Sequence, residues 1–282
     1  MATILIKGLG LIGSSLARII KLGHPDATVI AIDPNQDNIQ FALDHGFIDQ
    51  ASTSLVTAAG QADFIILAAP VSQIIADIHE LAQLSLKSSV VVTDVGSTKQ
   101  TVMNAAQELT TRGVAFVGGH PMAGSHLTGA VAGTADLFKD AFYFLVPATT
   151  DSGADRLQSL LSAAQVKWTP ISAPDHDKLV AQISHLPHVL AYTLVNQTAT
   201  TLAGQQPGIQ AVAGGFKSTT RIAQADPTMW TAIMQNNRGD IVHQLDEYLA
   251  DLQAVRDAID QGDLATLKEL FSTAARTRQG LN

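Results

Sequence analysis

The stretch TILIKGLGLIG, residues 3–13, decides the fold of the first half of the chain. Its first five residues are typical of a buried strand, and the glycines after them have the spacing G-x-G-x-x-G. In this spacing Gly8 permits a tight turn and Gly10 lets a phosphate group approach the backbone. Gly13 lets the helix that follows pack closely on the strand. The stretch therefore predicts a strand, a turn and a helix built around a phosphate-binding loop.

An acidic residue stands where a dinucleotide-binding strand places one. Asp33 follows the strand-like residues 28–32 and lies twenty positions beyond Gly13. Its carboxylate can accept hydrogen bonds from an adenosine ribose and repels a 2′-phosphate, and no arginine follows it. The N–H groups of Leu11 and Ile12, at the start of the expected helix, point toward the phosphates. The motif predicts NAD rather than NADP, with FAD as the alternative.

Strand-like and helical runs alternate through the first half of the sequence. Apolar runs at residues 64–68, 90–93 and 115–117 follow the first two strands, with a helical stretch at 35–45. Continuous apolar runs are typical of parallel strands covered on both faces. We expect residues 141–146 and 167–171 to form edge strands, flanking a helix that begins near residue 151. The pattern predicts an α/β fold with a Rossmann-type doubly wound parallel sheet.

The pattern changes after Ser172. Three long helical patterns follow, at residues 175–203, 227–261 and 264–278, and no strand pattern occurs beyond Pro174. Asp226-Pro227 is typical of a helix start, and Gly262-Asp263 of a break between two helices. We therefore expect a dinucleotide-binding domain over residues 1–172 and an all-helical domain over residues 173–282.

Composition excludes several classes of protein. The 282 residues are 46% hydrophobic and 15% charged, which excludes a disordered chain. The net charge of −8 argues against nucleic-acid or anionic-membrane partners. The absence of cysteine excludes disulfides and thiolate nucleophiles. No apolar run reaches the roughly 18 residues that span a bilayer, and the N-terminus does not resemble a signal peptide. We expect a cytoplasmic protein.

Two polar segments follow strands of the predicted sheet, at residues 93–99 and 118–126. Ligands of such sheets bind beyond the carboxyl ends of the strands. His120 is a candidate general base for removing a hydroxyl proton while a hydride leaves, and Ser97 is placed to share a hydrogen bond with the same hydroxyl. The alternative for His120 is a loop histidine bonded to the backbone.

The helical half adds two further candidates. Residues 184–188, Ser-His-Leu-Pro-His, place two imidazoles on one helix face. No carboxylate has the spacing of a zinc protease, so we expect no metal. Residues 214–221 place Lys217 and Arg221 among glycines and hydroxyls, which suits an anion pocket. The alternative is a solvated helix start.

Five segments together resemble the prephenate dehydrogenase family, the NAD(P)-linked enzymes of tyrosine biosynthesis. They are residues 8–15, 94–99, 119–124, 184–188 and 214–223, and they occur in family order. The resemblance implies oxidative decarboxylation of prephenate, a dianion, with NAD. The products would be 4-hydroxyphenylpyruvate, CO2 and NADH.

The resemblance also implies roles for individual residues. His120 would take the hydroxyl proton, and Ser97 would orient His120 and the hydroxyl. Arg221 and His188 match positions that hold the substrate's carboxylates. The remaining positions expected at the substrate pocket are Ser184, Gly214, Ser125, His126 and Trp230. Trp230 matches a residue that enters the pocket from the partner subunit, which implies a homodimer built on the helical domain.

His126 and Leu127 depart from the pattern of many relatives, which carry an acidic and a basic residue there. The ion network that gates the pocket in those relatives is therefore in doubt for this chain.

Three other functions stay open at this point. Arogenate, the amino counterpart of prephenate, is the alternative substrate. β-Hydroxyacid dehydrogenases and imine reductases share the two-part plan, but the catalytic lysine motif of the former is not found here. A non-catalytic NAD-binding protein would bind NAD without turnover.

Overall fold

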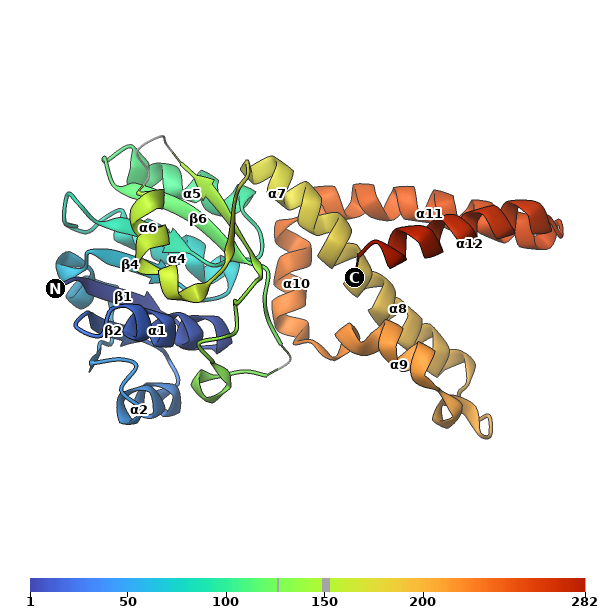
Figure 1. Cartoon of the computed structure of the whole chain (residues 1–282), viewed down its shortest axis with the longest axis horizontal. Helices are drawn as coiled ribbons and strands as arrows, with labels where there is room; N and C mark the ends of the chain where they lie inside the picture. Colours follow the sequence, from blue (N-terminus) through green and yellow to red (C-terminus); the bar gives the residue numbers. More distant parts are fainter. Residues whose placement is uncertain (126, 149–152, 282) are drawn as a thin grey trace.

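The computed structural model describes residues 1–125, 127–148 and 153–281, and an eight-stranded sheet forms the centre of its first half (Figure 1). The strands are β1 (Thr3–Lys7), β2 (Thr28–Ile32), β3 (Gln50–Ala51), β4 (Phe64–Leu67), β5 (Val91–Asp94), β6 (Ala115–Pro121), β7 (Phe142–Pro147) and β8 (Lys167–Pro170). They lie side by side in the order β3-β2-β1-β4-β5-β6-β7-β8.

Parallel pairing dominates this sheet. All neighbouring strands pair in parallel except β6 and β7, which are antiparallel. The strand order reverses at β1, which lies between β2 and β4, and ligands of such sheets bind at this point. The expected Rossmann-type doubly wound sheet is confirmed. The expectation that residues 141–146 form an edge strand is wrong, because β7 lies between β6 and β8.

Helices cover both faces of the sheet (Figure 1). They are α1 (Leu11–Gly23), α2 (Gln36–Asp44), α3 (Leu55–Ala58), α4 (Val71–Leu81), α5 (Gln100–Thr110) and α6 (Ala154–Leu160). Alternate residues of β1 enter opposite cores. Ile4 and Ile6 pack on the side of α1 and α6, whereas Leu5 packs on the side of α4 and α5. Because both faces are buried, the central strands are apolar throughout.

The second half of the chain is helical, as expected, and residues 171–281 contain no strand. Its helices are α7 (Ala173–Val180), α8 (Leu186–Thr201), α9 (Gly214–Thr220), α10 (Pro227–Asn236), α11 (Arg238–Asp260) and α12 (Leu264–Gln279). Two of the long helical patterns are interrupted. A π-helical turn, Ala181–His185, separates α7 from α8, and Asn237 separates α10 from α11.

Side-chain caps explain where three of these helices begin. Ser172, Asp226 and Asp263 each accept a hydrogen bond from a backbone N–H in the first turn of α7, α10 and α12. Pro227 occupies the first position of α10, where its missing N–H has no intrahelical role. The predicted helix start at Asp226-Pro227 and the predicted break at Gly262-Asp263 are confirmed.

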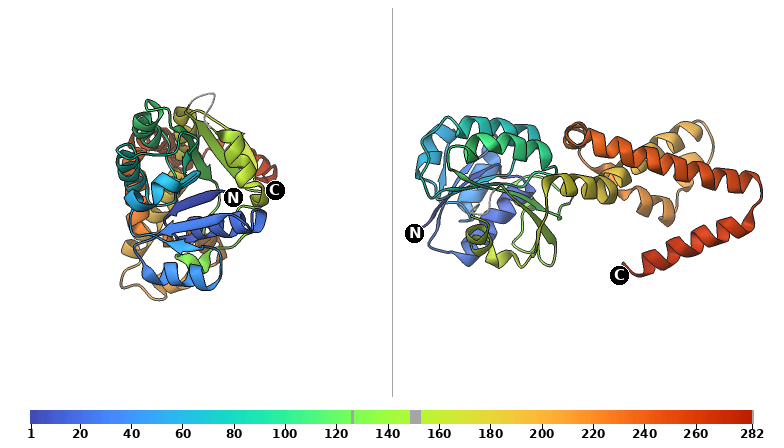
Figure 2. Two further views of the ribbon diagram at one scale, coloured as in Figure 1. Left: turned by 90° about the vertical axis from the view of Figure 1, so that its left-hand side faces the viewer. Right: turned by 90° about the horizontal axis from the view of Figure 1, so that it is seen from above.

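The hairpin of α11 and α12 extends away from the rest of the molecule (Figure 2). Its large exposed apolar side chains are Val242, Leu249, Leu252, Ile259, Leu264, Leu270 and Phe271. No helix in the described part of the chain is both long and apolar enough to cross a membrane.

Candidate active site

The glycine loop joins β1 to α1 where the strand order reverses. Gly8 has φ +100°, and a Cβ added there would overlap the backbone of Ala68, so the turn requires glycine. A Cβ at Gly13 would overlap the carbonyl oxygen of Gly8. Gly10 has open space around it and caps α1 without a side-chain hydrogen bond. The first N–H groups of α1, which starts at Leu11, are therefore left for phosphate oxygens.

Asp33 lies beside this loop at the end of β2. Its Oδ2 accepts the Leu9 N–H at 2.6 Å, and its Oδ1 accepts the Asn35 N–H at 2.8 Å. The amide of Asn38 donates to the same Oδ1 at 3.2 Å. No cation is among the partners of Asp33 in the part of the chain that the structure describes. A carboxylate held this way suits a ribose diol and disfavours a 2′-phosphate.

The segment that follows β6 returns to the cofactor side of the sheet. The Oδ1 of Asn38 accepts the Ala130 N–H at 2.9 Å, and the hydroxyl of Ser15 accepts the Thr134 N–H at 3.0 Å. The loop that carries Ser125 is therefore anchored at its far end beside α1 and α2.

A buried ion pair fixes the ends of β5 and β6. Lys99 and Asp94 are fully buried and make a close ion pair, and Lys99 Nζ also donates to the Gly119 carbonyl at 2.7 Å. A buried pair of charges is tolerated only when both keep their partners, so these contacts resist separation. The contacts of Lys99 hold the turn after β5, which contains Ser97, beside β6, which contains His120.

His120 is hydrogen-bonded to a second histidine, which comes from the helical half. The Nδ1 of His120 lies 2.8 Å from Nε2 of His176, and Nδ1 of His176 lies 2.7 Å from Oδ1 of Asp177. Both α7 residues are buried. Asp177 also accepts the backbone N–H groups of Lys99 and Gln100, at 2.7 and 2.8 Å, and thereby ties α7 to the start of α5.

His176 and Asp177 were not among the residues predicted from the sequence. Asn237, between α10 and α11, supports them, since its side-chain amide donates to the Asp177 carbonyl at 2.8 Å and lies 3.2 Å from Nδ1 of His185. The only signal in the sequence is a His-Asp pair two residues beyond Pro174, which has no distinctive spacing.

Burial holds the pKa of His120 well below its usual range, and the charge of neighbouring Lys99 acts in the same direction. A neutral imidazole at neutral pH is what a general base requires. Ser97 is half-buried, and no hydrogen bond joins it to His120 within the described residues. The observed partner of His120 is His176, which differs from the expectation that Ser97 orients it.

His185 and His188 face the same tryptophan. The Trp230 ring centroid lies 3.5 Å from that of His188 and 5.9 Å from that of His185. Nδ1 of His188 lies 2.8 Å from the Ser184 carbonyl oxygen. Trp230 makes these contacts within its own chain.

Arg221 follows α9 directly and completes this side of the site. Burial lowers the pKa of His188, and the charge of nearby Arg221 lowers it further. Burial also lowers the pKa of His185, to about 4, against the opposing charge of Asp177, and His176 and His188 are among its neighbours. Arg221 is exposed, so its guanidinium is accessible to a ligand. The histidines thus form a continuous group between the sheet and the helices.

Within the described residues, no hydrogen bond joins Ser125 or Gly214 to this group. Ser125 is exposed, and its hydroxyl accepts the Leu127 N–H at 3.1 Å. Gly214 begins α9, where a Cβ would meet no atom within 4 Å. His126 lies outside the described residues.

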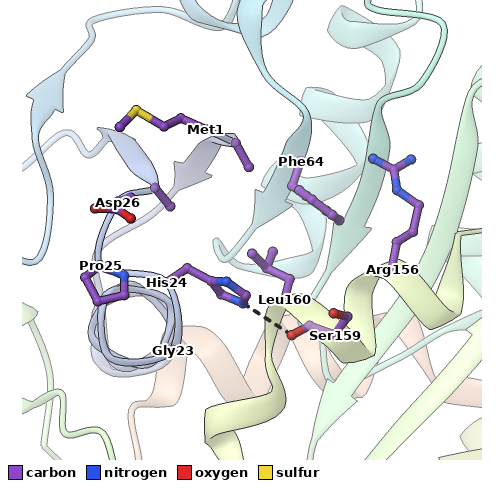
Figure 3. Close-up of a pocket in the computed structure, with 11 residues that line it drawn as sticks. Met1, Gly23, His24, Pro25, Asp26, Phe64, Arg156, Ser159 and Leu160 are labelled. Atoms are coloured by element: carbon purple, nitrogen blue, oxygen red, sulfur yellow. Dashed lines mark hydrogen bonds between the residues drawn. The ribbon is translucent and has the colours of Figure 1, made fainter.

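A separate cavity lies at the other end of the sheet, beside the starts of β1 and β4 (Figure 3). His24, Asp26, Arg156 and Ser159 are among its lining residues. None of the predicted site residues lines it, and ligands of such sheets bind at the opposite ends of the strands. Among the described residues, no group of three or more His, Asp or Glu side chains is arranged to hold a metal ion.

The fold and the site define an NAD-dependent dehydrogenase with a separate helical half. Residues 16–167 match the model of the prephenate dehydrogenase nucleotide-binding domain, and residues 172–273 match that of the prephenate dehydrogenase dimerization domain. The chain belongs to the prephenate dehydrogenase family, and it is an oxidoreductase that uses NAD.

Individual relatives agree with this assignment. The chain is 38% identical over 281 residues to prephenate dehydrogenase of Bacillus subtilis, covering 99% of this chain and 76% of that protein. The structure of Aquifex aeolicus prephenate dehydrogenase with hydroxyphenyl propionate and NAD+ has a TM-score of 0.92 at 27% identity, covering 100% and 99% of the two chains. Synechocystis arogenate dehydrogenase has a TM-score of 0.84 at 27% identity, covering 99% and 100%.

Proposed function

We propose that this chain catalyses the NAD-dependent oxidative decarboxylation of prephenate to 4-hydroxyphenylpyruvate, CO2 and NADH, a step of tyrosine biosynthesis. The observation that carries the proposal is that His120, a neutral base, and Arg221, an accessible cation, belong to one group of side chains. His185 and His188 lie between them. Oxidation of a dianionic hydroxy acid needs a base for the hydroxyl proton and a cation for a carboxylate. Dependence on NAD, an intracellular cofactor, supports the expected cytoplasmic location.

In this reaction His120 takes the proton of the substrate's hydroxyl at Nε2, because its Nδ1 is engaged with His176. Bound NAD supplies the acceptor for the hydride that leaves the carbon bearing that hydroxyl. Ser97, on the turn after β5, is proposed to hydrogen-bond the same hydroxyl. Loss of CO2 then makes the ring aromatic, and this makes the reaction irreversible.

Arg221 and His188 are proposed to hold the two carboxylates, since a guanidinium binds a carboxylate through two hydrogen bonds. Ser184, Gly214, Ser125, His126 and Trp230 are proposed to line the rest of the pocket. The proposed NAD contacts are Gly8, Gly10, Leu11, Ile12, Gly13 and Asp33.

Steady-state rates with each substrate and each cofactor test this function. We expect NADH formation from prephenate and NAD, with a lower kcat/KM for NADP because Asp33 repels a 2′-phosphate. Arogenate is the second candidate, since the fold closely matches that of Synechocystis arogenate dehydrogenase. Arogenate carries an additional ammonium group that Arg221 repels, so we expect a lower rate. A preference for arogenate of more than tenfold would contradict the proposal.

We also propose that the chain divides into a dinucleotide-binding domain, residues 1–172, and a helical substrate and dimerisation domain, residues 173–282. The change from strands to helices supports this boundary, since β8 ends at Pro170 and α7 begins at Ala173.

We propose that the chain forms a homodimer through its helical half. The match of residues 172–273 to a dimerization domain supports this proposal. No residue of α12 is buried in the single chain, and apolar side chains along α11 and α12 are exposed. An exposed apolar surface of this kind is typical of a protein interface.

Replacing Leu249 and Phe271 together with glutamate is expected to convert the dimer to a monomer. These side chains are 52% and 60% exposed in the single chain, and a buried charge at an interface lacks a partner. Light scattering after size exclusion measures the mass. Val56→Glu is the control, because Val56 is 63% exposed on α3 of the other domain. A single-chain mass for the unaltered protein would contradict the dimer.

A further inference from the structure

The hydrogen bonds from Asp177 to His120 can run in only one direction when both histidines are neutral. A carboxylate accepts but does not donate, so Nδ1 of His176 donates to Asp177. The Nε2 of neutral His176 then carries a lone pair and accepts from Nδ1 of His120. The Nε2 of His120 is left without a proton. We infer that His176 and Asp177 are positioning residues that fix His120 in the tautomer required of the base.

The surroundings of His176 favour this direction over its reverse. Only a protonated His176 would donate through both ring nitrogens and leave His120 with its proton on Nε2. Burial lowers the pKa of His176, which opposes protonation, although the adjacent Asp177 raises that pKa. The ring of Phe144 packs edge-on against His176 at 5.4 Å between centroids, which adds an apolar wall.

The charged and titratable groups around the two histidines come from three segments. Lys99 and Asp94 lie at the turn between β5 and α5, Asp177 lies on α7, and His185 lies in the π-helical turn. Lys99 is paired with Asp94, and Asp177 accepts two backbone N–H groups. Asp177 is therefore held as an acceptor by contacts that do not depend on His176.

The inference deepens the proposed function, because it concerns the base assigned to that reaction. When Nε2 of His120 takes the hydroxyl proton, the ring becomes an imidazolium. The bond from its Nδ1–H to His176 then becomes charge-assisted and stronger. His176 thus sets the tautomer before proton transfer and stabilises the charge after it, without touching the substrate.

Nitrogen-15 NMR of histidine-labelled full-length protein at pH 8 tests the tautomer directly. The His120 signals are assigned as those lost in the His120→Asn spectrum. We expect a protonated Nδ1 and an unprotonated Nε2 at His120, and a proton on Nε2 would overturn the inference. This measurement requires no turnover. If the expected tautomer is found but prephenate gives no NADH, the proposed function fails while the inference stands.

Two replacements of His176 provide a kinetic test. Phenylalanine fills the site without an acceptor, whereas the side-chain oxygen of glutamine can accept the His120 Nδ1–H. We expect His176→Phe to lower kcat by about 10-fold or more, up to the roughly 10⁴-fold that loss of a tautomer-fixing group can cost, with KM and the Kd for NAD little changed. His176→Gln should recover about tenfold of that loss. His79→Gln, at an exposed site, is the control.

Equal loss of kcat in the phenylalanine and glutamine variants would overturn the inference, since it would show a packing role only. A raised KM with unchanged kcat would also overturn it. If the phenylalanine variant does not fold, the NMR measurement on the unaltered protein still decides.

Discussion

Replacement of His120 with asparagine is expected to lower kcat by about 100-fold or more, because a general base typically contributes about 10²- to 10⁴-fold. The asparagine amide can still donate a hydrogen bond to His176, but it cannot take a proton from the substrate. The Kd for NAD should stay within about twofold, since the proposed cofactor contacts lie on the glycine loop and Asp33. Steady-state kinetics at saturating prephenate and calorimetric titration with NAD measure the two quantities.

His79→Gln is the matched control for this substitution. His79 is half-exposed on α4 and lies 3.0 Å from Glu108, away from the proposed site. Its replacement should leave kcat unchanged. If His120→Asn retains more than about a tenth of the activity, His120 is not the base.

The low pKa of His120 also predicts the pH dependence of the reaction. His120 acts as a base only when neutral, so the rate falls as the pH drops through its pKa. Because burial holds that pKa well below its usual range, the midpoint of the fall in kcat/KM should lie well below 6.5, the ordinary pKa of histidine. A fall centred near pH 7 that persists in His120→Asn would assign the titration to another group.

The sequence predicts most of the sheet because its central strands are apolar on both faces. It does not predict β3, since Gln50 and Ala51 form a two-residue strand with both side chains exposed. It also does not predict the direction of β7. Whether β7 runs parallel or antiparallel to β6 depends on the path of the connecting residues 127–141. The hydrophobic pattern of a strand carries no information on the path of its connection.

The candidate site is also only partly predictable, because some of its contacts join segments that are far apart in the sequence. His120 and Arg221 belong to motifs with distinctive residues, so the sequence singles them out as candidates. His176 and Asp177 acquire their roles from contacts between the two halves, where Asp177 accepts N–H groups some 77 positions away. For the same reason the sequence suggests Ser97 as the partner of His120, whereas the observed partner is His176. A local motif cannot show which side chain of α7 packs against His120.

Replacement of Arg221 with alanine is expected to raise the KM for prephenate by about 10- to 100-fold, because a hydrogen bond between charged groups is worth roughly 1.5–3 kcal/mol. The value of kcat should change less, since Arg221 is proposed to bind a carboxylate in the ground state and in the transition state alike. Initial rates over a range of prephenate concentrations separate the two parameters.

Lys217→Ala distinguishes a direct contact of Arg221 from the general positive charge of α9. Lys217 lies four residues earlier and is also exposed, so its removal lowers the local charge by the same amount. If the Arg221 guanidinium binds the carboxylate through two hydrogen bonds, Lys217→Ala should raise KM by no more than about threefold. Arg221→Lys should then restore only part of the affinity that Arg221→Ala loses. Equal increases in KM for the two alanine variants would mean that Arg221 attracts the dianion without binding it, and an unchanged KM in Arg221→Ala would remove it from the pocket.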